Sequence, residues 1–143
     1  MEKTIFCNNP GETRNAAIAF AVTLKPGDVV ALHGELGAGK TTFVRMVARH
    51  LGYDGVVNSP TFTLMNIYKT DKLALYHFDF YRISNEIEAL GFGADEFIGA
   101  SDTISFIEWP ERAPGVLPEK HHTVEITIPD FTGSPEAREI RIS

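Results

Sequence analysis

The residues most able to do chemistry form the segment GELGAGKT at 34–41, which fits the phosphate-binding pattern G-x-x-x-x-G-K-S/T at every fixed position. In this pattern the glycines let the backbone come close to phosphate oxygens. Lys40 can then reach the β- and γ-phosphates, and the hydroxyl of Thr41 is a suitable ligand for Mg²⁺. We therefore predict that the chain binds a nucleoside triphosphate.

The sequence on both sides of this loop supports the prediction. An apolar, β-branched run at 28–33 predicts a buried strand directly before the loop. After the loop, apolar side chains recur at helical spacing, and Gly52 is suited to end the helix after Arg49 and His50. A strand, a glycine loop and a helix N-terminus together surround an anion with backbone N–H groups and the positive end of a helix dipole. The alternative is a glycine turn that happens to precede a lysine. Such a turn would not need a strand before it and a helix after it.

Two carboxylates stand where predicted strands end. Glu108 closes the apolar run ISFIE, and Asp79 lies near the end of LALYHFDF. An acid that ends a buried strand is costly unless it is paired or bound to a metal, and ligand crevices of α/β proteins lie at such strand ends. We predict that both acids are functional, with a salt bridge or a cap as the alternative at each position. His77 shares a strand face with Asp79 and could orient it, but a hydrogen-bonded structural histidine is an equally good interpretation.

The remaining elements are predicted from periodicity and from turn residues. A strand at 4–7 is followed by a helix that Asn9 caps, with Pro10 and Glu12 in its first turn, and that continues to about residue 23. Ser84 can cap a short helix that ends at Gly91. Further strand-like runs lie at 62–68, 73–80, 103–109, 123–128 and 137–142, and the first two are predicted to form a hairpin. This order predicts an α/β fold of the P-loop NTPase type, with three layers and a mixed parallel and antiparallel sheet, in a single domain at 1–143.

Composition limits the possible partners. The 143 residues carry a net charge of −6, and lysine and arginine are scattered along the sequence. A protein that grips nucleic acid alone is expected to have a basic face, so we expect no strong direct binding to nucleic acid. The sequence has no apolar stretch long enough to cross a bilayer, which favours a location away from the membrane. It contains a single cysteine, Cys7, which favours the cytoplasm.

Four sequence blocks carry a family resemblance. GELGAGKTTF at 34–43, SPTFTL at 59–64, HFDFYR at 77–82 and IEWPER at 107–112 follow one another in the order and spacing of the TsaE (formerly YjeE) family of bacterial ATPases. The chain resembles that family over nearly its whole length. Members of the family serve the biosynthesis of threonylcarbamoyladenosine, the modified adenosine at position 37 of tRNA, next to the anticodon.

The resemblance implies roles for individual residues. It implies catalytic roles for Lys40 and for Thr61 in a loop that senses the γ-phosphate. It also implies that Asp79 is the acid that orients the attacking water or the hydration shell of the metal. It places Mg²⁺ at Thr41 and Glu108. The residues that it assigns to ATP or ADP are Thr13, Gly37, Ala38, Gly39, Lys40, Thr41, Thr42 and Arg138.

The function implied by the resemblance is a slow, Mg²⁺-dependent ATPase that acts as an accessory or resetting subunit of the tRNA modification machinery. Its partner would be the two-subunit threonylcarbamoyl-transfer core, made of TsaB and TsaD type proteins. The sequence contains no obvious arginine finger, which is consistent with weak activity in the absence of that partner.

Other function classes were weighed against this one. A small-molecule or nucleoside kinase usually needs an arginine-rich lid, and the sequence has no arginine-dense segment. A GTPase would need a guanine-reading N-K-x-D segment, which is absent. A nucleotide-gated binding module without turnover remains an alternative that only phosphate-release measurements distinguish.

Four further positions have no assigned role. Trp109 should face away from Glu108 and pack in the core, although a strand end could place it beside the nucleotide. Arg82 is either structural or balances negative charge on a phosphate or a partner. The pair His121–His122 lacks the neighbouring ligands of a zinc site.

Overall fold

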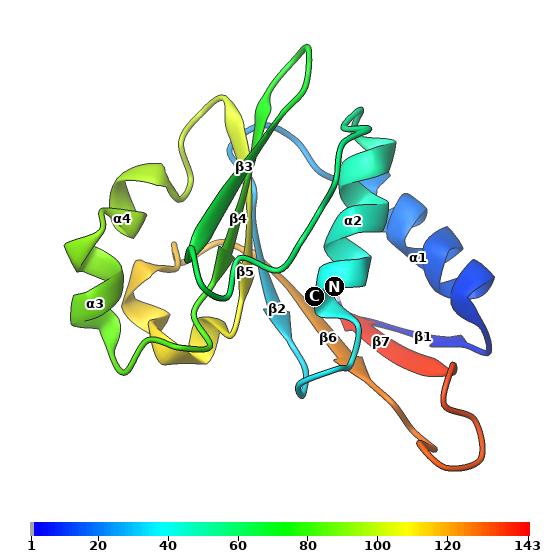
Figure 1. Ribbon diagram of the computed structural model, residues 1–143. Helices are drawn as coiled ribbons and strands as arrows, with labels where there is room; N and C mark the ends of the chain where they lie inside the picture. Colours follow the sequence, from blue (N-terminus) through cyan, green and yellow to red (C-terminus); the bar gives the residue numbers. More distant parts are fainter. Residues whose placement is uncertain (1) are drawn as a thin grey trace.

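In the computed structural model, which describes residues 2–143, seven strands form one mixed sheet in the order β1-β7-β6-β2-β5-β4-β3 (Figure 1). β2 pairs in parallel with β5 and β6, and β4 pairs in parallel with β5, whereas β3, β7 and β1 join the sheet antiparallel. The strands are β1 (Lys3–Cys7), β2 (Val29–His33), β3 (Met65–Lys69), β4 (Ala74–Asp79), β5 (Thr103–Glu108), β6 (His122–Thr127) and β7 (Arg138–Ile142). The predicted α/β fold with a mixed sheet is confirmed.

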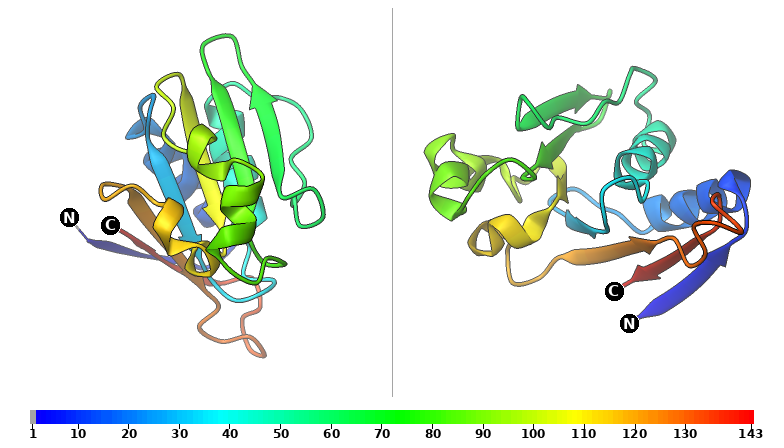
Figure 2. Two further views of the ribbon diagram at one scale, coloured as in Figure 1. Left: turned by 90° about the vertical axis from the view of Figure 1, so that its left-hand side faces the viewer. Right: turned by 60° about the horizontal axis from the view of Figure 1, so that its bottom comes forward.

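Helices cover both faces of this sheet, which gives three layers (Figure 2). α1 (Pro10–Val22) and α2 (Lys40–His50) lie side by side on one face, where Phe20 and Val44 join the larger core cluster. The other face carries α3 (Glu86–Gly91), α4 (Ala94–Phe97) and the 3₁₀ turns η1 (Pro110–Arg112) and η2 (Pro114–Val116), around a second cluster. The central strands are therefore buried on both faces, as their continuous apolar sequences require.

The predicted boundaries of the first two helices are confirmed. The side chain of Asn9 accepts a hydrogen bond from the backbone of Glu12, and Pro10 begins α1. Gly52 follows the C-cap of α2 with a φ of 107°, a left-handed conformation that glycine adopts without strain. Among residues 2–143, no helix is long and apolar enough to cross a membrane.

Three details of the middle of the chain differ from the prediction. β3 begins at Met65 and not at residue 62, because Leu64 has a φ of 68° and its N–H donates to the carbonyl of Pro60, which makes 60–64 a turn. The cap of α3 is Asn85 and not Ser84, since the Asn85 side chain accepts from two backbone N–H groups in the first turn. The four-residue helix α4 was not predicted.

The parallel strands β2, β4 and β5 bring three functional segments to one edge of the sheet. The phosphate loop follows β2, while Asp79 and Glu108 are the last residues of β4 and β5 and are register partners. The predicted acids are therefore neighbours because two parallel strands end at the same level.

Candidate functional site

An open cleft of about 360 Å³ lies where the phosphate loop meets the ends of β4 and β5. Its lining residues are Leu36, Gly37, Gly39, Lys40, Thr41, Thr42, Ser59, Thr61, Asp79, Tyr81, Glu108 and Trp109. The three residues predicted to be catalytic and both predicted metal ligands thus line one cleft.

The phosphate loop has the backbone that its glycines make possible. Gly37 and Gly39 have φ angles of 84° and 108°, and a Cβ on Gly34 would lie 2.7 Å from the carbonyl oxygen of Ile126. Gly39 is the N-cap of α2 without a side-chain cap, so the first N–H groups of the helix have no side-chain acceptor at this position. A helix N-terminus of this kind favours an anion.

Lys40 is buried in the cleft and is held by the loop itself. Its Nζ donates to the carbonyl oxygen of Gly34 and, at 3.0 Å, to that of Glu35. Burial lowers the pKa of Lys40 below its usual value, and the carboxylates of Glu108 and Asp79 oppose this shift. The ammonium group is therefore poorly hydrated and close to two anionic side chains, and it can move to a phosphate by exchanging its carbonyl partners.

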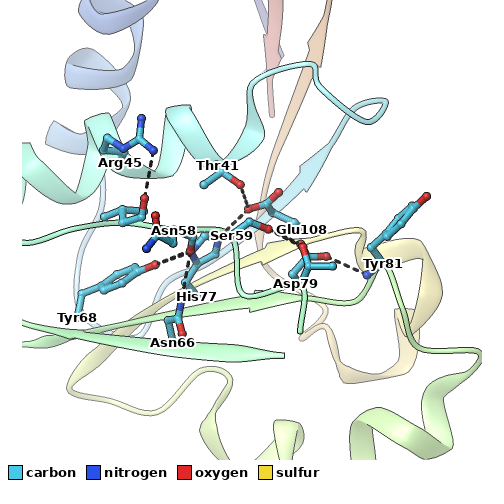
Figure 3. Close-up of polar contacts among 12 residues, drawn as sticks. Thr41, Arg45, Asn58, Ser59, Asn66, Tyr68, His77, Asp79, Tyr81 and Glu108 are labelled. Carbon is cyan, nitrogen blue, oxygen red and sulfur yellow. Dashed lines mark hydrogen bonds and ion pairs between the residues drawn. The ribbon is translucent and has the colours of Figure 1, made fainter. Parts of the chain in front are cut away.

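Glu108 is 4% exposed and connects α2 with β4 (Figure 3). Its Oε2 accepts a hydrogen bond from the Thr41 hydroxyl at 2.7 Å and lies 2.6 Å from Nε2 of His77. The two predicted metal ligands are thus in direct contact with each other.

Asp79 is 2% exposed and is bound by the 59–61 loop (Figure 3). Its Oδ2 accepts hydrogen bonds from Ser59 Oγ at 2.9 Å and from Thr61 Oγ1 at 2.8 Å, and its Oδ1 accepts one from the backbone N–H of Tyr81. The two hydroxyl oxygens lie 2.7 Å apart. The sequence did not single out Ser59, although the S-P-T-F block contained it.

The donor set fits Mg²⁺ better than a transition metal. Within residues 2–143, no group of three or more His, Cys, Asp or Glu side chains is placed to hold a metal ion. Mg²⁺ keeps several waters and commonly takes only one or two protein ligands together with substrate phosphates. One hydroxyl and one carboxylate beside a phosphate loop satisfy that requirement.

Thr13 and Arg138 lie outside this cleft, in a smaller hollow next to it. The hollow measures about 120 Å³, and Gly39 and Thr42 line both sites. Arg138 Nε donates to the carbonyl oxygen of Ala38 at 2.8 Å. The residues assigned to the nucleotide thus form two adjoining hollows, one beside Lys40 and the other beside α1 and β7.

Trp109 packs against the second core cluster, as its default interpretation held, and its ring also lines the cleft. Its φ of 58° ends the regular strand after Glu108, so the alternation of strand faces does not extend to it. The ring lies in the cleft with Lys40 Nζ 4.4 Å from its centroid and the ring of Tyr81 5.0 Å away. Its core packing is therefore confirmed, and its placement beside a nucleotide stays a prediction.

Neither Arg82 nor His122 lines the cleft. The guanidinium of Arg82 stacks on the exposed ring of Phe62 at 4.6 Å. His122 Nε2 lies 3.1 Å from Oδ2 of Asp28, so its described partner is a carboxylate.

Folding also gathers basic residues that are separated in the sequence. A groove of about 450 Å³ between α1 and α2 is lined by Arg14, Arg45, Arg49 and His50, together with Ile18, Thr42 and Met46. Lysine and arginine are therefore scattered along the sequence, but three arginines are close together on this surface.

The chain is similar to known proteins along most of its length. A family model described as "Threonylcarbamoyl adenosine biosynthesis protein TsaE" matches residues 7–139. The tRNA threonylcarbamoyladenosine biosynthesis protein TsaE of Bacillus subtilis is 42% identical over 118 residues, which cover 82% of this chain and 73% of that protein. The protein of the same name from Rickettsia typhi is 44% identical over 124 residues, covering 86% and 85%. The crystal structure of Bacillus subtilis YdiB matches with a TM-score of 0.80 at 33% identity, covering 99% of this chain and 84% of that one.

Proposed function

The chain belongs to the TsaE family of threonylcarbamoyl adenosine biosynthesis proteins, and we propose that it is an Mg²⁺-dependent ATP-binding protein with slow ATPase activity. Family membership assigns it to tRNA threonylcarbamoyladenosine biosynthesis. The finer activity is supported by one observation above all. Lys40 and Thr41 of the phosphate loop face the two strand-end carboxylates, Asp79 and Glu108, across a single cleft.

Each residue of the cleft has a task in phosphoryl transfer. The N–H groups at the start of α2 would bind the β-phosphate, and Lys40 would exchange the carbonyls of Gly34 and Glu35 for β- and γ-phosphate oxygens. Thr41 and Glu108 would hold Mg²⁺, which would supply positive charge to offset the negative charge of the phosphates.

Asp79 is the group best placed to orient a water molecule. Its Oδ2 accepts hydrogen bonds from two hydroxyls of the 59–61 loop and its Oδ1 accepts one from the N–H of Tyr81, so a hydroxyl that turns away would free an acceptor position on Oδ2. We propose that the γ-phosphate provides the alternative acceptor for Thr61. Binding of ATP would then free one acceptor position on Oδ2 for the attacking water, while Ser59 continues to donate to that oxygen.

The nucleoside would occupy the smaller hollow, with Thr13 and Arg138 beside it. That hollow shares Gly39 and Thr42 with the phosphate cleft, so a nucleotide could extend from one into the other. Arg138 is already fixed to the phosphate loop through Ala38, which would align its guanidinium before ATP binds.

We propose that the isolated chain hydrolyses ATP slowly and that it acts together with a partner. No arginine lines the phosphate cleft within residues 2–143, so the charge that develops on the γ-phosphate would be balanced by Lys40 and the metal alone. We propose that the protein acts as an accessory or resetting subunit of the threonylcarbamoyl-transfer core formed by TsaB and TsaD type proteins.

The test measures binding and turnover separately. ATP, ADP and GTP are titrated with and without Mg²⁺, using the fluorescence of Trp109, the single tryptophan of the chain, which lies in the cleft. ADP and phosphate release are then measured with and without the purified transfer core. Tight ATP binding with slow, core-stimulated release of phosphate supports the proposal. Stoichiometric transfer of phosphate to an added nucleoside or other small molecule would favour the kinase alternative, and binding without turnover would favour a nucleotide-gated module.

A further inference from the structure

His77 is the most completely buried polar side chain near the cleft, with no exposed surface, and both of its ring nitrogens have partners. Nδ1 lies 2.8 Å from the hydroxyl of Tyr68, and Nε2 lies 2.6 Å from Oε2 of Glu108. The three side chains come from β3, β4 and β5, which are adjacent strands (Figure 3). They form a hydrogen-bonded row that runs across one face of the sheet toward Thr41.

The available protons assign the direction of the contact between His77 and Glu108. A carboxylate only accepts hydrogen bonds, so the short contact with Glu108 requires a proton on Nε2 of His77. The Tyr68 hydroxyl has one proton and two neighbours, Nδ1 of His77 and the carbonyl oxygen of Asn58, so it either donates to Nδ1 or accepts a hydrogen bond from it. In both arrangements Tyr68 holds the imidazole ring at Nδ1 while Nε2 donates to Glu108.

We propose that His77, with Tyr68 behind it, is a positioning residue that turns the Glu108 carboxylate toward the metal. Oε2 is held by two donors, His77 and Thr41, whereas Oε1 accepts no hydrogen bond within residues 2–143. Fixing one oxygen in this way leaves the other with a defined direction. The inference rests on the proposed function, because it assumes that Glu108 binds Mg²⁺. Outer-shell groups of this kind orient metal-binding side chains in other proteins.

The same row reaches the loop that binds the other acid. The Tyr68 hydroxyl is also 3.2 Å from the carbonyl oxygen of Asn58, which immediately precedes the Ser59–Thr61 segment on Asp79. Asn66 donates to the same carbonyl at 3.1 Å. The segment at 58–61 is therefore connected to Glu108 through Tyr68 and to Asp79 directly, so the two carboxylates share one support.

A purely structural histidine would predict different behaviour from a positioning residue. Loss of a structural contact lowers stability and affects nucleotide binding equally with and without Mg²⁺. Loss of a positioning contact acts on the metal-dependent part of binding. The informative quantity is therefore the Mg²⁺ gain, defined as the dissociation constant of metal-free ATP divided by that of Mg²⁺–ATP.

The experiment measures this gain by calorimetry in the full chain for Tyr68→Phe and His77→Leu, with unfolding temperatures recorded for each variant. Tyr53→Phe is the matched control, because its ring lies 4.8 Å from that of Tyr68 and its hydroxyl has no contact with His77. Glu108→Gln is the reference for loss of the metal ligand. His77→Gln retains an N–H donor near the position of Nε2 and tests rescue.

We expect His77→Leu to reduce the Mg²⁺ gain by about 10-fold to 100-fold, the usual effect of losing an outer-shell partner, and Tyr68→Phe to reduce it by about 10-fold. Tyr53→Phe should stay within about twofold of the wild-type gain, and His77→Gln should recover part of the loss. Metal-free ATP binding should change little in all of them. If His77→Leu does not fold, Tyr68→Phe decides the question.

Two results would overturn the inference. One is a wild-type Mg²⁺ gain in Tyr68→Phe, or in a folded His77→Leu. The other is an equal loss of ATP binding with and without the metal, which identifies a structural role. A wild-type protein that shows no Mg²⁺ gain at all would instead contradict the proposed metal site.

Discussion

Asp79 and Glu108 end two adjacent parallel strands as register partners, and each is almost fully buried. Their polar contacts are nevertheless separate, since Glu108 binds the hydroxyl of Thr41 whereas Asp79 binds the 59–61 loop. Two carboxylates this close would repel each other if they were alone, and the ammonium group of Lys40 is attracted to both. The site therefore has two acids with different partners and one cation that balances them.

The separate contacts of Asp79 allow a nearly isosteric test of its role. In Asp79→Asn, the amide oxygen can accept from the N–H of Tyr81, and the amide N–H₂ can donate to the hydroxyls of Ser59 and Thr61. We expect an unchanged unfolding temperature and ATP affinity, with ATP hydrolysis slowed by about 10²-fold or more because the general base is lost. Single-turnover hydrolysis measures this, and retention of the wild-type rate would assign the water to another residue.

The two hydroxyls on Asp79 provide a matched pair of variants. Thr61→Val and Ser59→Ala each remove one hydrogen bond to the same oxygen, Oδ2. If Thr61 senses the γ-phosphate as proposed, Thr61→Val should slow hydrolysis by about 10²-fold, as for other donors to a developing charge, whereas Ser59→Ala should have a much smaller effect. ADP affinity should be unchanged in both, because ADP has no γ-phosphate. Equal effects of the two variants on hydrolysis would show that only the support of Asp79 matters.

The lowered pKa of Lys40 predicts opposite pH dependences for two measurements. Between this lowered pKa and its usual value of 10.5, the unfolded chain binds the lysine proton more strongly than the folded one, so the contribution of Lys40 to stability rises with pH. Phosphate binding favours the ammonium form, so metal-free ATP affinity should fall in the same alkaline range, by at most about tenfold per pH unit. Calorimetric titrations in EDTA and unfolding curves from neutral to alkaline pH check both. Lys40→Met should bind ATP weakly and without this pH dependence, and an equally steep decline in that variant would assign the proton elsewhere.

How far the sequence predicts this site depends on whether local or long-range contacts determine a residue's position. The phosphate loop, the helix after it and the two acids were predictable, because glycine spacing and strand ends are local properties. The position of the Trp109 ring in the cleft was not predictable from strand alternation. Trp109 itself has a left-handed backbone conformation, which ends the alternation of side chains after Glu108. The pairing of Tyr68 with His77 depends on the register of a hairpin whose first strand starts three residues later than its sequence indicates.

The basic groove between α1 and α2 is also formed by long-range contacts, since it depends on how the two helices pack. It is the surface of the protein on which tRNA binding can be tested. Its three arginines could neutralise at most about three phosphates, which corresponds to a salt slope of about −2 to −3 for log K against log salt. With a net charge of −6 on the chain, we expect only weak tRNA binding by the isolated protein, negligible at physiological salt. Fluorescence anisotropy with labelled tRNA at several salt concentrations measures the slope, and Arg14→Gln with Arg49→Gln should flatten it. Tight binding that resists salt would contradict the expectation that the protein reaches tRNA through partners.

The last prediction concerns those partners. The 59–61 loop holds Asp79 from the rim of the cleft, and Phe62 next to it is 83% exposed, so a γ-phosphate that attracts Thr61 would change an exposed apolar surface. We therefore expect the threonylcarbamoyl-transfer core to bind this protein more tightly with ATP than with ADP. By linkage, the core must then increase ATP affinity by the same factor. Calorimetry of the purified proteins with ATP, ADP and no nucleotide measures both sides of this relation, with Lys40→Ala as the variant that should lose the difference. Association that is indifferent to the nucleotide would leave the ATP site intact and contradict its coupling to the core.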